Sequence, residues 1–371
     1  QLEEAAVELN GYLGSSNSRG VAAALDTAGV IYEAYDAYRV RFPEEDEVYR
    51  KRRERLLGML LKGLAGFRSE VRQEALFVLG RRVFGSALLG EHEKRRAFLL
   101  TQKKLLALVG EDQGQELTFY YRAAMLGRVY RFITEQDILR GGFRFGEKRP
   151  VAFFPGTFDP FTLSHKGIVR SIRDLGYEVM LAIDEFSWSK KTQPHRVRRR
   201  IASMSVADEF HVHIFPEDFP VNIANPENLK RLREAFPGRD VAVVVGSDVV
   251  RGASSYRKAP EPGSIHGFDH VIFRRDDGGE APDYSAITGH VTELQLPTHL
   301  EDISSTRIRE AVDQGRDISH FIDSVAQEYI YLHGLYLREP LDKPLLRPED
   351  LDFQHHLWLD ADTEALLARD A

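Results

Sequence analysis

The spacing of apolar residues divides the chain into two parts with different secondary structure. Up to about residue 142, apolar residues recur three and four positions apart, as in the segment 56–64. This spacing places them on one face of a helix. From Pro150 onward, short apolar runs alternate with amphipathic segments. The first part is therefore predicted to be helical throughout, and the second to be an α/β domain.

The second part contains a regular alternation of predicted strands and helices. The predicted strands are Val151–Phe154, Glu178–Ile183, Phe210–Phe215, Val241–Val245, Asp269–Arg274 and Val291–Leu296. The predicted helices are His165–Leu175, Pro194–Ala207, Pro226–Phe236, Ser304–Gln314 and Ser324–His333. This alternation indicates a Rossmann-like, doubly wound parallel sheet with helices on both faces. In such sheets, ligands bind beyond the carboxyl ends of the strands.

Changes in composition suggest the domain boundaries. Residues 1–146 are expected to form a helical domain that can serve as an interaction module for a protein partner. One segment, Val71–Gly80, is typical of a HEAT-type repeat helix, although no second copy recurs at a fixed spacing. Residues 147–338 form the predicted α/β domain. Residues 339–371 are acidic and contain prolines, which is typical of a linker or the start of a further domain. Because the chain begins with Gln1, we interpret it as part of a longer polypeptide.

Composition and charge narrow the classes of function. The chain has 371 residues, of which 43% are hydrophobic, enough to build more than one core. Its net charge of −7 argues against nucleic acid as a partner. The absence of cysteine excludes disulfides, thiolate metal sites and a cysteine nucleophile. No apolar run approaches 18 residues and no signal peptide is visible, so a cytoplasmic protein without a membrane span is expected.

Two segments have the pattern of phosphate-binding sites. Gly156–His165 links a predicted strand to a predicted helix through a glycine turn, and Ile303–Arg309 is a hydroxyl-rich helix start that carries arginines. Backbone N–H groups at a helix start are unpaired and carry partial positive charge. Two such starts in one domain can hold the polyphosphate of a nucleotide from both sides.

From about Pro150 to Tyr336, the chain resembles the nucleotidyltransferase superfamily, and within it most closely the nicotinate- or nicotinamide-nucleotide adenylyltransferases. That family carries Gly-x-Phe-Asp-Pro-x-(His or Thr)-x-x-His near its start and Ile-Ser-Ser-Thr-x-Ile-Arg near its end. Further matching stretches are Lys190-Lys191 with His195-Arg196, Gly246-Ser247-Asp248, Ile272-Phe273-Arg274-Arg275, and Glu328-Tyr329-Ile330 with His333-Gly334-Leu335-Tyr336. The resemblance covers about half of the chain. One departure is Ser164, which replaces the usual glycine and would be strained if the position required a positive φ.

The resemblance implies a set of site residues. His165, Thr162 and Arg309 are the expected catalytic residues, acting on the phosphates of ATP. Arg307 lies about 200° round the predicted helix from Arg309, so only Arg309 is assigned to phosphate. The acceptor mononucleotide is expected at Trp188 and at Lys190 or Lys191. The other expected ATP-binding residues are Gly156, Thr157, Phe158, Gly246, Asp248, Ile303, Ser304, Ser305 and Thr306.

Several of these residues also have a structural interpretation. Asp159 precedes a proline. It is interpreted as a turn-forming residue in preference to a metal ligand. Asp248 is expected to accept from ribose hydroxyls or to cap a helix, and the two roles are compatible. Gly156 is expected to let the backbone approach the nucleotide. Mg²⁺ is expected as the cofactor, bound mainly through ATP phosphates, and no protein residue is assigned as its ligand.

The resemblance implies an enzyme of the EC 2.7.7 type that transfers AMP from ATP to the phosphate of nicotinate or nicotinamide mononucleotide. The products are a dinucleotide and pyrophosphate. Its partners would be ATP and a small phosphorylated acceptor. One alternative is a sister transferase with another acceptor, as in pantetheine-phosphate or cytidylyl transfer. A second alternative is a helical scaffold whose transferase-like domain senses a nucleotide and is weakly active.

Overall fold

The helical region forms the amino-terminal part of the computed structural model. The structure describes residues 2–110, 119–143, 145, 148–183, 192–217, 219–274, 283–295, 300 and 303–337. The helices are α1 (Leu2–Tyr12), α2 (Ser18–Arg41), α3 (Asp46–Ala65), α4 (Ser69–Val78), a π-helical turn (Leu79–Phe84), α5 (Glu91–Gly110) and α6 (Phe119–Arg140). Their apolar stripes meet in a core that includes Leu25, Tyr32, Leu60 and Ala75. The apolar residues spaced three and four positions apart therefore lie on the buried faces of these helices.

A six-stranded parallel sheet forms the centre of the second part, as predicted. Its strands are β1 (Val151–Gly156), β2 (Glu178–Ile183), β3 (Val212–Ile214), β4 (Val241–Gly246), β5 (Asp269–Phe273) and β6 (Val291–Leu294). They are arranged in the order β3-β2-β1-β4-β5-β6, and every neighbouring pair is parallel. The chain order reverses between β1 and β4. The carboxyl ends of these two strands are the place where a Rossmann-like sheet binds its ligand.

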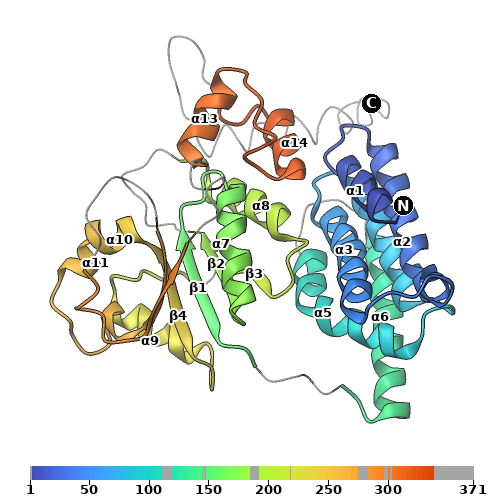
Figure 1. Ribbon diagram of the computed structural model, residues 1–371, viewed down its shortest axis with the longest axis horizontal. Coiled ribbons are helices and arrows are strands. Elements are labelled where there is room, and N and C mark those ends of the chain that lie inside the picture. Colours follow the sequence, from blue (N-terminus) through green and yellow to red (C-terminus); the bar gives the residue numbers. More distant parts are fainter. Residues whose placement is uncertain are drawn as a thin grey trace, which may run out of the picture.

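Helices cover both faces of this sheet. They are α7 (Leu163–Asp174), α8 (His195–Val206), α9 (Pro226–Glu234), α10 (Ser247–Gly252), α11 (Ser254–Arg257), a 3-10 turn (Ile265–Gly267), α13 (Ser305–Asp313) and α14 (Ser324–Leu332). Figure 1 shows α7 and α8 on the face toward the helical region, and α9, α10 and α11 on the opposite side. Helices α13 and α14 lie together near one end of the sheet.

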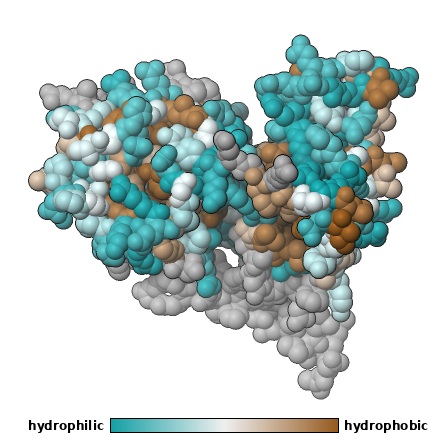
Figure 2. All heavy atoms as spheres, turned by 90° about the horizontal axis from the view of Figure 1, so that it is seen from below, coloured by the Kyte–Doolittle hydropathy of each residue, from teal (hydrophilic) through white to brown (hydrophobic). Residues whose placement is uncertain are grey.

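The helical region and the α/β part share one hydrophobic core. A continuous cluster of buried residues runs from the leucines of α2 and α3 to α7, α8 and α14. A second cluster fills the other face of the sheet, beneath α9 and the 3-10 turn. Seen from below, the surface is mostly hydrophilic, and apolar patches appear on the lobe that the helical region forms, on the right (Figure 2). Of the helices that the structure describes, none combines the length and the hydropathy that a bilayer span requires.

Candidate active site

His165 is held at the start of α7 by a reciprocal pair of hydrogen bonds with Thr162. Thr162 is the N-cap of α7, and its Oγ1 accepts from the backbone N–H of His165 at 3.2 Å. In return, Nδ1 of His165 accepts from the backbone N–H of Thr162 at 3.0 Å. This is a capping box in which a histidine takes the place of the usual glutamate. It extends α7 two residues upstream of the predicted start.

The capping box also fixes the tautomer of the His165 ring. An Nδ1 atom that accepts an N–H must carry a lone pair, so the proton of the neutral imidazole is on Nε2. The ring is seated against two aromatic side chains, with centroid distances of 5.1 Å to Phe158 and 5.3 Å to Phe161. His165 is thus oriented to donate a hydrogen bond through Nε2. Ser164 lies in the helix, without the positive φ that would strain it.

The turn from Gly156 to Pro160 is shaped by packing as well as by backbone geometry. Phe158 adopts a left-handed conformation with φ of 47°, and its buried ring lies over Gly156. A Cβ atom at Gly156 would lie 2.6 Å from that ring. The structure therefore gives this glycine a packing role, in addition to the close approach expected from sequence. The Asp159–Pro160 peptide bond is cis.

Asp159 has the structural role that was expected, but its carboxylate bonds to distant segments of the domain and not to its own loop. Its carboxylate is buried and accepts the Tyr336 hydroxyl at 2.7 Å. It also accepts the backbone N–H of Gln193, at 3.3 and 3.4 Å. Burial raises the pKa of Asp159, while the Tyr336 hydroxyl and Arg309 act in the opposite direction. A carboxylate engaged in this way serves as a structural hub of the site.

The start of α13 contacts the same turn from the other side. Ser304 is the N-cap of α13 and accepts the Arg307 N–H at 3.2 Å. Ser305 donates its hydroxyl to the carbonyl of Pro160 at 2.9 Å, and Arg309 donates to the carbonyl of Asp159 at 2.6 Å. The two predicted phosphate-binding segments are therefore in direct contact, although they are about 150 residues apart.

The arginines of α13 lie on different faces, as the helical spacing predicts. The guanidinium of Arg309 faces the turn and also donates to the Thr306 hydroxyl at 3.0 Å. That of Arg307 lies 5.0 Å from the ring centroid of Phe321. Ile303 is buried behind the helix start, whereas Ser304 and Thr306 are exposed. Arg309 is therefore the arginine of α13 whose hydrogen bond to the 156–165 segment the structure describes.

The carboxyl end of β4 brings Gly246 and Asp248 to the same sheet edge. Gly246 is the N-cap of α10, so Asp248 lies in the first helical turn and the expectation that it caps the helix is wrong. A Cβ atom at Gly246 would lie 2.2 Å from Oδ1 of Asp248 and 3.3 Å from the Phe273 ring. The glycine thus leaves room for the aspartate side chain to fold back over the strand end. Thr157 contributes its carbonyl, which accepts from Arg198 at 2.6 Å.

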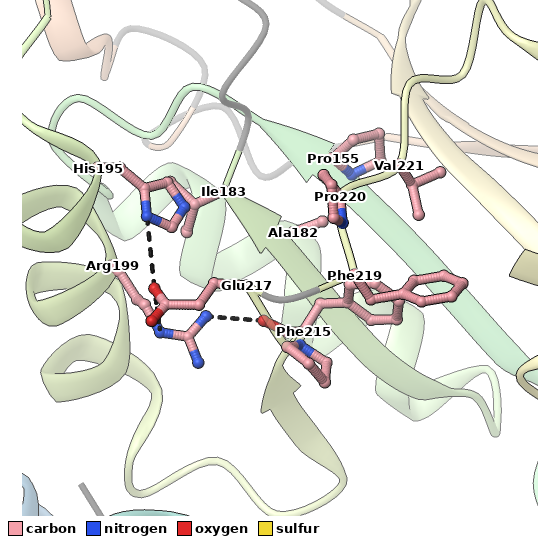
Figure 3. A pocket seen from close by; sticks show the side chains of 11 residues that line it. Pro155, Ala182, Ile183, His195, Arg199, Phe215, Glu217, Phe219, Pro220 and Val221 are labelled. Carbon is pink, nitrogen blue, oxygen red and sulfur yellow. Dashed lines mark hydrogen bonds and ion pairs between the residues drawn. The ribbon is translucent and has the colours of Figure 1, made fainter. Parts of the chain in front are cut away.

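A pocket opens beside these residues, beyond the ends of β1, β2 and β3. In Figure 3, His195 and Arg199 line one side of it, and Pro155 and Pro220 lie across from them. Arg199 donates to the carbonyl of Phe215 at 2.7 Å, and Glu217 lies 3.6 Å from Nδ1 of His195. The other lining residues are Ala182, Ile183, Pro216, Phe219 and Val221. Phe215 packs in the core and also lines this pocket.

Some of the expected site residues lie outside the described residues, and some residues of the site were not predicted from the sequence. Trp188, Lys190 and Lys191, assigned to the acceptor, lie outside the described residues. Sequence reasoning missed Arg198, which is buried and also donates to the carbonyl of Gln193 at 2.8 Å. It also missed Arg199 as a pocket residue, although its position one helical turn after His195 was a usable signal.

The part of the chain that the structure describes contains no cluster of side chains that could by itself bind a metal ion. Groups of three or more His, Asp or Glu side chains placed to bind one ion do not occur among those residues. Asp159 is the carboxylate within the turn, and it already accepts hydrogen bonds from Tyr336 and Gln193.

Comparison with known proteins agrees with this geometry. Residues 153–311 match the family described as cytidylyltransferase-like. A probable nicotinate-nucleotide adenylyltransferase of Flavobacterium johnsoniae is 21% identical over 193 residues, which is 50% of this chain and 98% of that protein. The one from Thermus thermophilus is 24% identical over 199 residues, with 50% and 98% covered.

A solved structure is also similar. It is nicotinic acid mononucleotide adenylyltransferase of Plasmodium falciparum, complexed with NaAD. Its sequence identity is 20% and its TM-score is 0.43, and the match covers 51% of this chain and 98% of that one. The family match, the parallel sheet and the two contacting motifs agree on one assignment. Residues 153–311 form a cytidylyltransferase-like domain of the nucleotidyltransferase superfamily of enzymes.

Proposed function

We propose that this protein transfers AMP from ATP to the phosphate of nicotinate or nicotinamide mononucleotide. The observation that carries the proposal is the contact between two capped helix starts, α7 with His165 and α13 with Arg309, at the ends of β1 and β4. Both helix starts offer backbone N–H groups to anionic oxygens. The names of the relatives support the pyridine nucleotide as acceptor.

The proposed chemistry is an in-line displacement at the α-phosphorus of ATP. An oxygen of the acceptor phosphate forms the new bond, the bond to pyrophosphate breaks, and its electron pair leaves with pyrophosphate. The acceptor phosphate is anionic at neutral pH, so the reaction needs no protein base. His165 donates through Nε2 to a phosphate oxygen, where negative charge grows in the transition state. Arg309 and the α13 start stabilise the departing phosphates, and the rigid turn provides alignment.

The acceptor is proposed to bind in the pocket beyond β1, β2 and β3. The Phe219 ring and the neighbouring prolines offer an apolar wall for a flat pyridine ring, while Arg199 and His195 lie on the polar side. Lys190 or Lys191 would neutralise the acceptor phosphate. Asp248 would accept from a ribose hydroxyl. This arrangement would place the two phosphates on either side of Gly156, at the switch point of the sheet.

Mg²⁺ fits this site as an ion carried by the nucleotide. The carboxylate within the turn, that of Asp159, accepts the Tyr336 hydroxyl, and we propose phosphate oxygens and water as the main ligands of the ion. Mg²⁺ commonly keeps several waters and takes few protein ligands. When bound, it would neutralise charge on the ATP phosphates.

The family description also favours one alternative, cytidylyl transfer to a different phosphorylated acceptor. A panel assay separates the two. The protein is incubated with Mg²⁺, with ATP or CTP, and with nicotinate mononucleotide, nicotinamide mononucleotide or phosphopantetheine, while pyrophosphate release is measured. We expect release with ATP and a pyridine mononucleotide. If pyrophosphate is released with CTP and an acceptor but not with ATP, the alternative replaces the proposal. No release with any pair would favour a nucleotide-sensing scaffold.

A further inference from the structure

A buried ion cluster joins the helical region to the α/β part. Lys62 of α3 is 4% exposed, and its Nζ lies 2.6 Å from Oδ2 of Asp323. Lys166 of α7 is 3% exposed and donates to the same oxygen at 3.3 Å and to Asp208 at 2.7 Å. Burial alone would raise the pKa of Asp208, but Lys62 and Lys166 lower it to about 2. Asp208 is therefore ionised at neutral pH, and the two lysines and two aspartates lie close enough to stabilise one another.

The cluster is connected to the start of α7 by two adjacent contacts. Lys166 is the residue that follows His165, so a displacement of one backbone position moves the other. The N–H of Leu163 donates to the carbonyl of Phe321 at 2.9 Å, two residues before Asp323. Asp323 also caps α14 by accepting the Val325 N–H at 3.1 Å. The short segment 321–323 therefore lies between α3 and the first turn of α7, and contacts both.

We infer that Lys62, a residue of the helical region, is a positioning residue for His165. It anchors Asp323, and Asp323 together with the Phe321 carbonyl fixes the first turn of α7. Without Lys62, the Asp323 carboxylate would keep Lys166 but would lose its shortest cation contact inside a buried site. A small displacement of a catalytic group lowers the rate strongly even when binding is retained. The helical region would thus act in the reaction through the geometry of α7.

The test compares Lys62→Met with Lys103→Met. Methionine keeps much of the lysine side-chain volume and removes the charge. Lys103 also pairs with the α/β part, but its partner Glu178 begins β2, at the sheet end remote from Thr162. Hydrogen–deuterium exchange is followed in residues 162–170 and, as an internal reference, in β4. For Lys62→Met we expect exchange at least tenfold faster in residues 162–170, with β4 unchanged, and wild-type rates for Lys103→Met.

The kinetic readout rests on the proposed function. In adenylyl transfer, Lys62→Met should lower kcat at least tenfold and change KM for ATP less than threefold, and Lys103→Met should change neither. Exchange and kcat within twofold of wild type would overturn the inference, as would equal acceleration in β4. If Lys62→Met does not fold, Asp323→Asn replaces it, because an amide oxygen can still cap α14. Exchange needs no substrate, so it decides the inference even if the wild-type protein transfers no AMP.

Discussion

Replacing Tyr336 with Phe tests the role of Asp159 as the hub of the site. The hydroxyl of Tyr336 donates to Oδ1 of Asp159 at 2.7 Å, and both side chains are buried. A hydrogen bond to a charged group contributes about 1.5–3 kcal/mol net. Phenylalanine fills the same space, so no cavity cost is added. The bonds from Gln193 that remain are long, at 3.3 and 3.4 Å, and cannot replace the lost donor. We therefore expect the free energy of unfolding to fall by about 2 kcal/mol.

The assay is thermal unfolding, with Tyr329→Phe as the matched control. Tyr329 is also a buried tyrosine of the carboxyl-terminal segment, but its hydroxyl makes no hydrogen bond to any residue that the structure describes. A loss of about 2 kcal/mol lowers the Tm by roughly 4–8 °C for a unit of this size. Tyr336→Phe should show this shift, and Tyr329→Phe should not.

The pH dependence of this difference has a definite sign. The Tyr336 hydroxyl lowers the pKa of Asp159 against the effect of burial, so its removal raises that pKa further. Below that pKa the Asp159 carboxyl group of the variant is protonated. Burying the neutral carboxyl group costs less free energy than burying the carboxylate. The Tm difference between wild type and Tyr336→Phe should therefore shrink as the pH falls through the acid range. A shift below 1 °C at neutral pH, or an equal shift in Tyr329→Phe, would refute the reasoning.

Three further predictions follow. His165→Ala should lower kcat by about a hundredfold or more while the protein still folds, because it removes a donor that acts on transition-state charge; turnover within threefold of wild type would exclude this role. In the same assay, Arg309→Ala should lower turnover far more than Arg307→Ala, and equal losses would show that both arginines reach the nucleotide. Burial lowers the pKa of His270 to about 4, so the stability that neutral His270 provides above pH 6.5 is lost as the pH falls toward 4. In thermal scans, His270→Gln should reduce the slope of Tm against pH in this range, and an unchanged slope would contradict it.

The sequence predicts the elements of the α/β part well because their period is unambiguous. Glu178–Ile183 was predicted as a strand with the bounds that β2 has, and the bounds of α8, α9, α13 and α14 differ from their predictions by at most two residues at either end. The start of α7 was missed because the pattern does not show that a histidine can close a capping box with Thr162. Strand β3 is shorter than predicted, since an apolar run does not reveal where pairing stops.

Tertiary contacts account for most of what sequence could not predict about the site. The contact between the two motifs follows from their shared sheet edge, but the bonds from Ser305 and Arg309 to backbone carbonyls leave no mark in the sequence. No sequence pattern predicts that Lys62 and Lys166 are buried, since a lysine is rarely buried unless its partner is also present. Their partner Asp323 is distant in sequence, so no local pattern reveals the cluster.

The ion pair between Lys62 and Asp323 also bears on how the protein is made. The two residues are 261 positions apart. At about 5–20 residues per second, a ribosome needs on the order of 15–50 s to travel between them. During that interval Lys62 has no Asp323 to pair with, and a lysine in water is an easily tolerated state. Lys62 therefore gains its shortest carboxylate contact, and its buried environment is completed, only after Asp323 has been made.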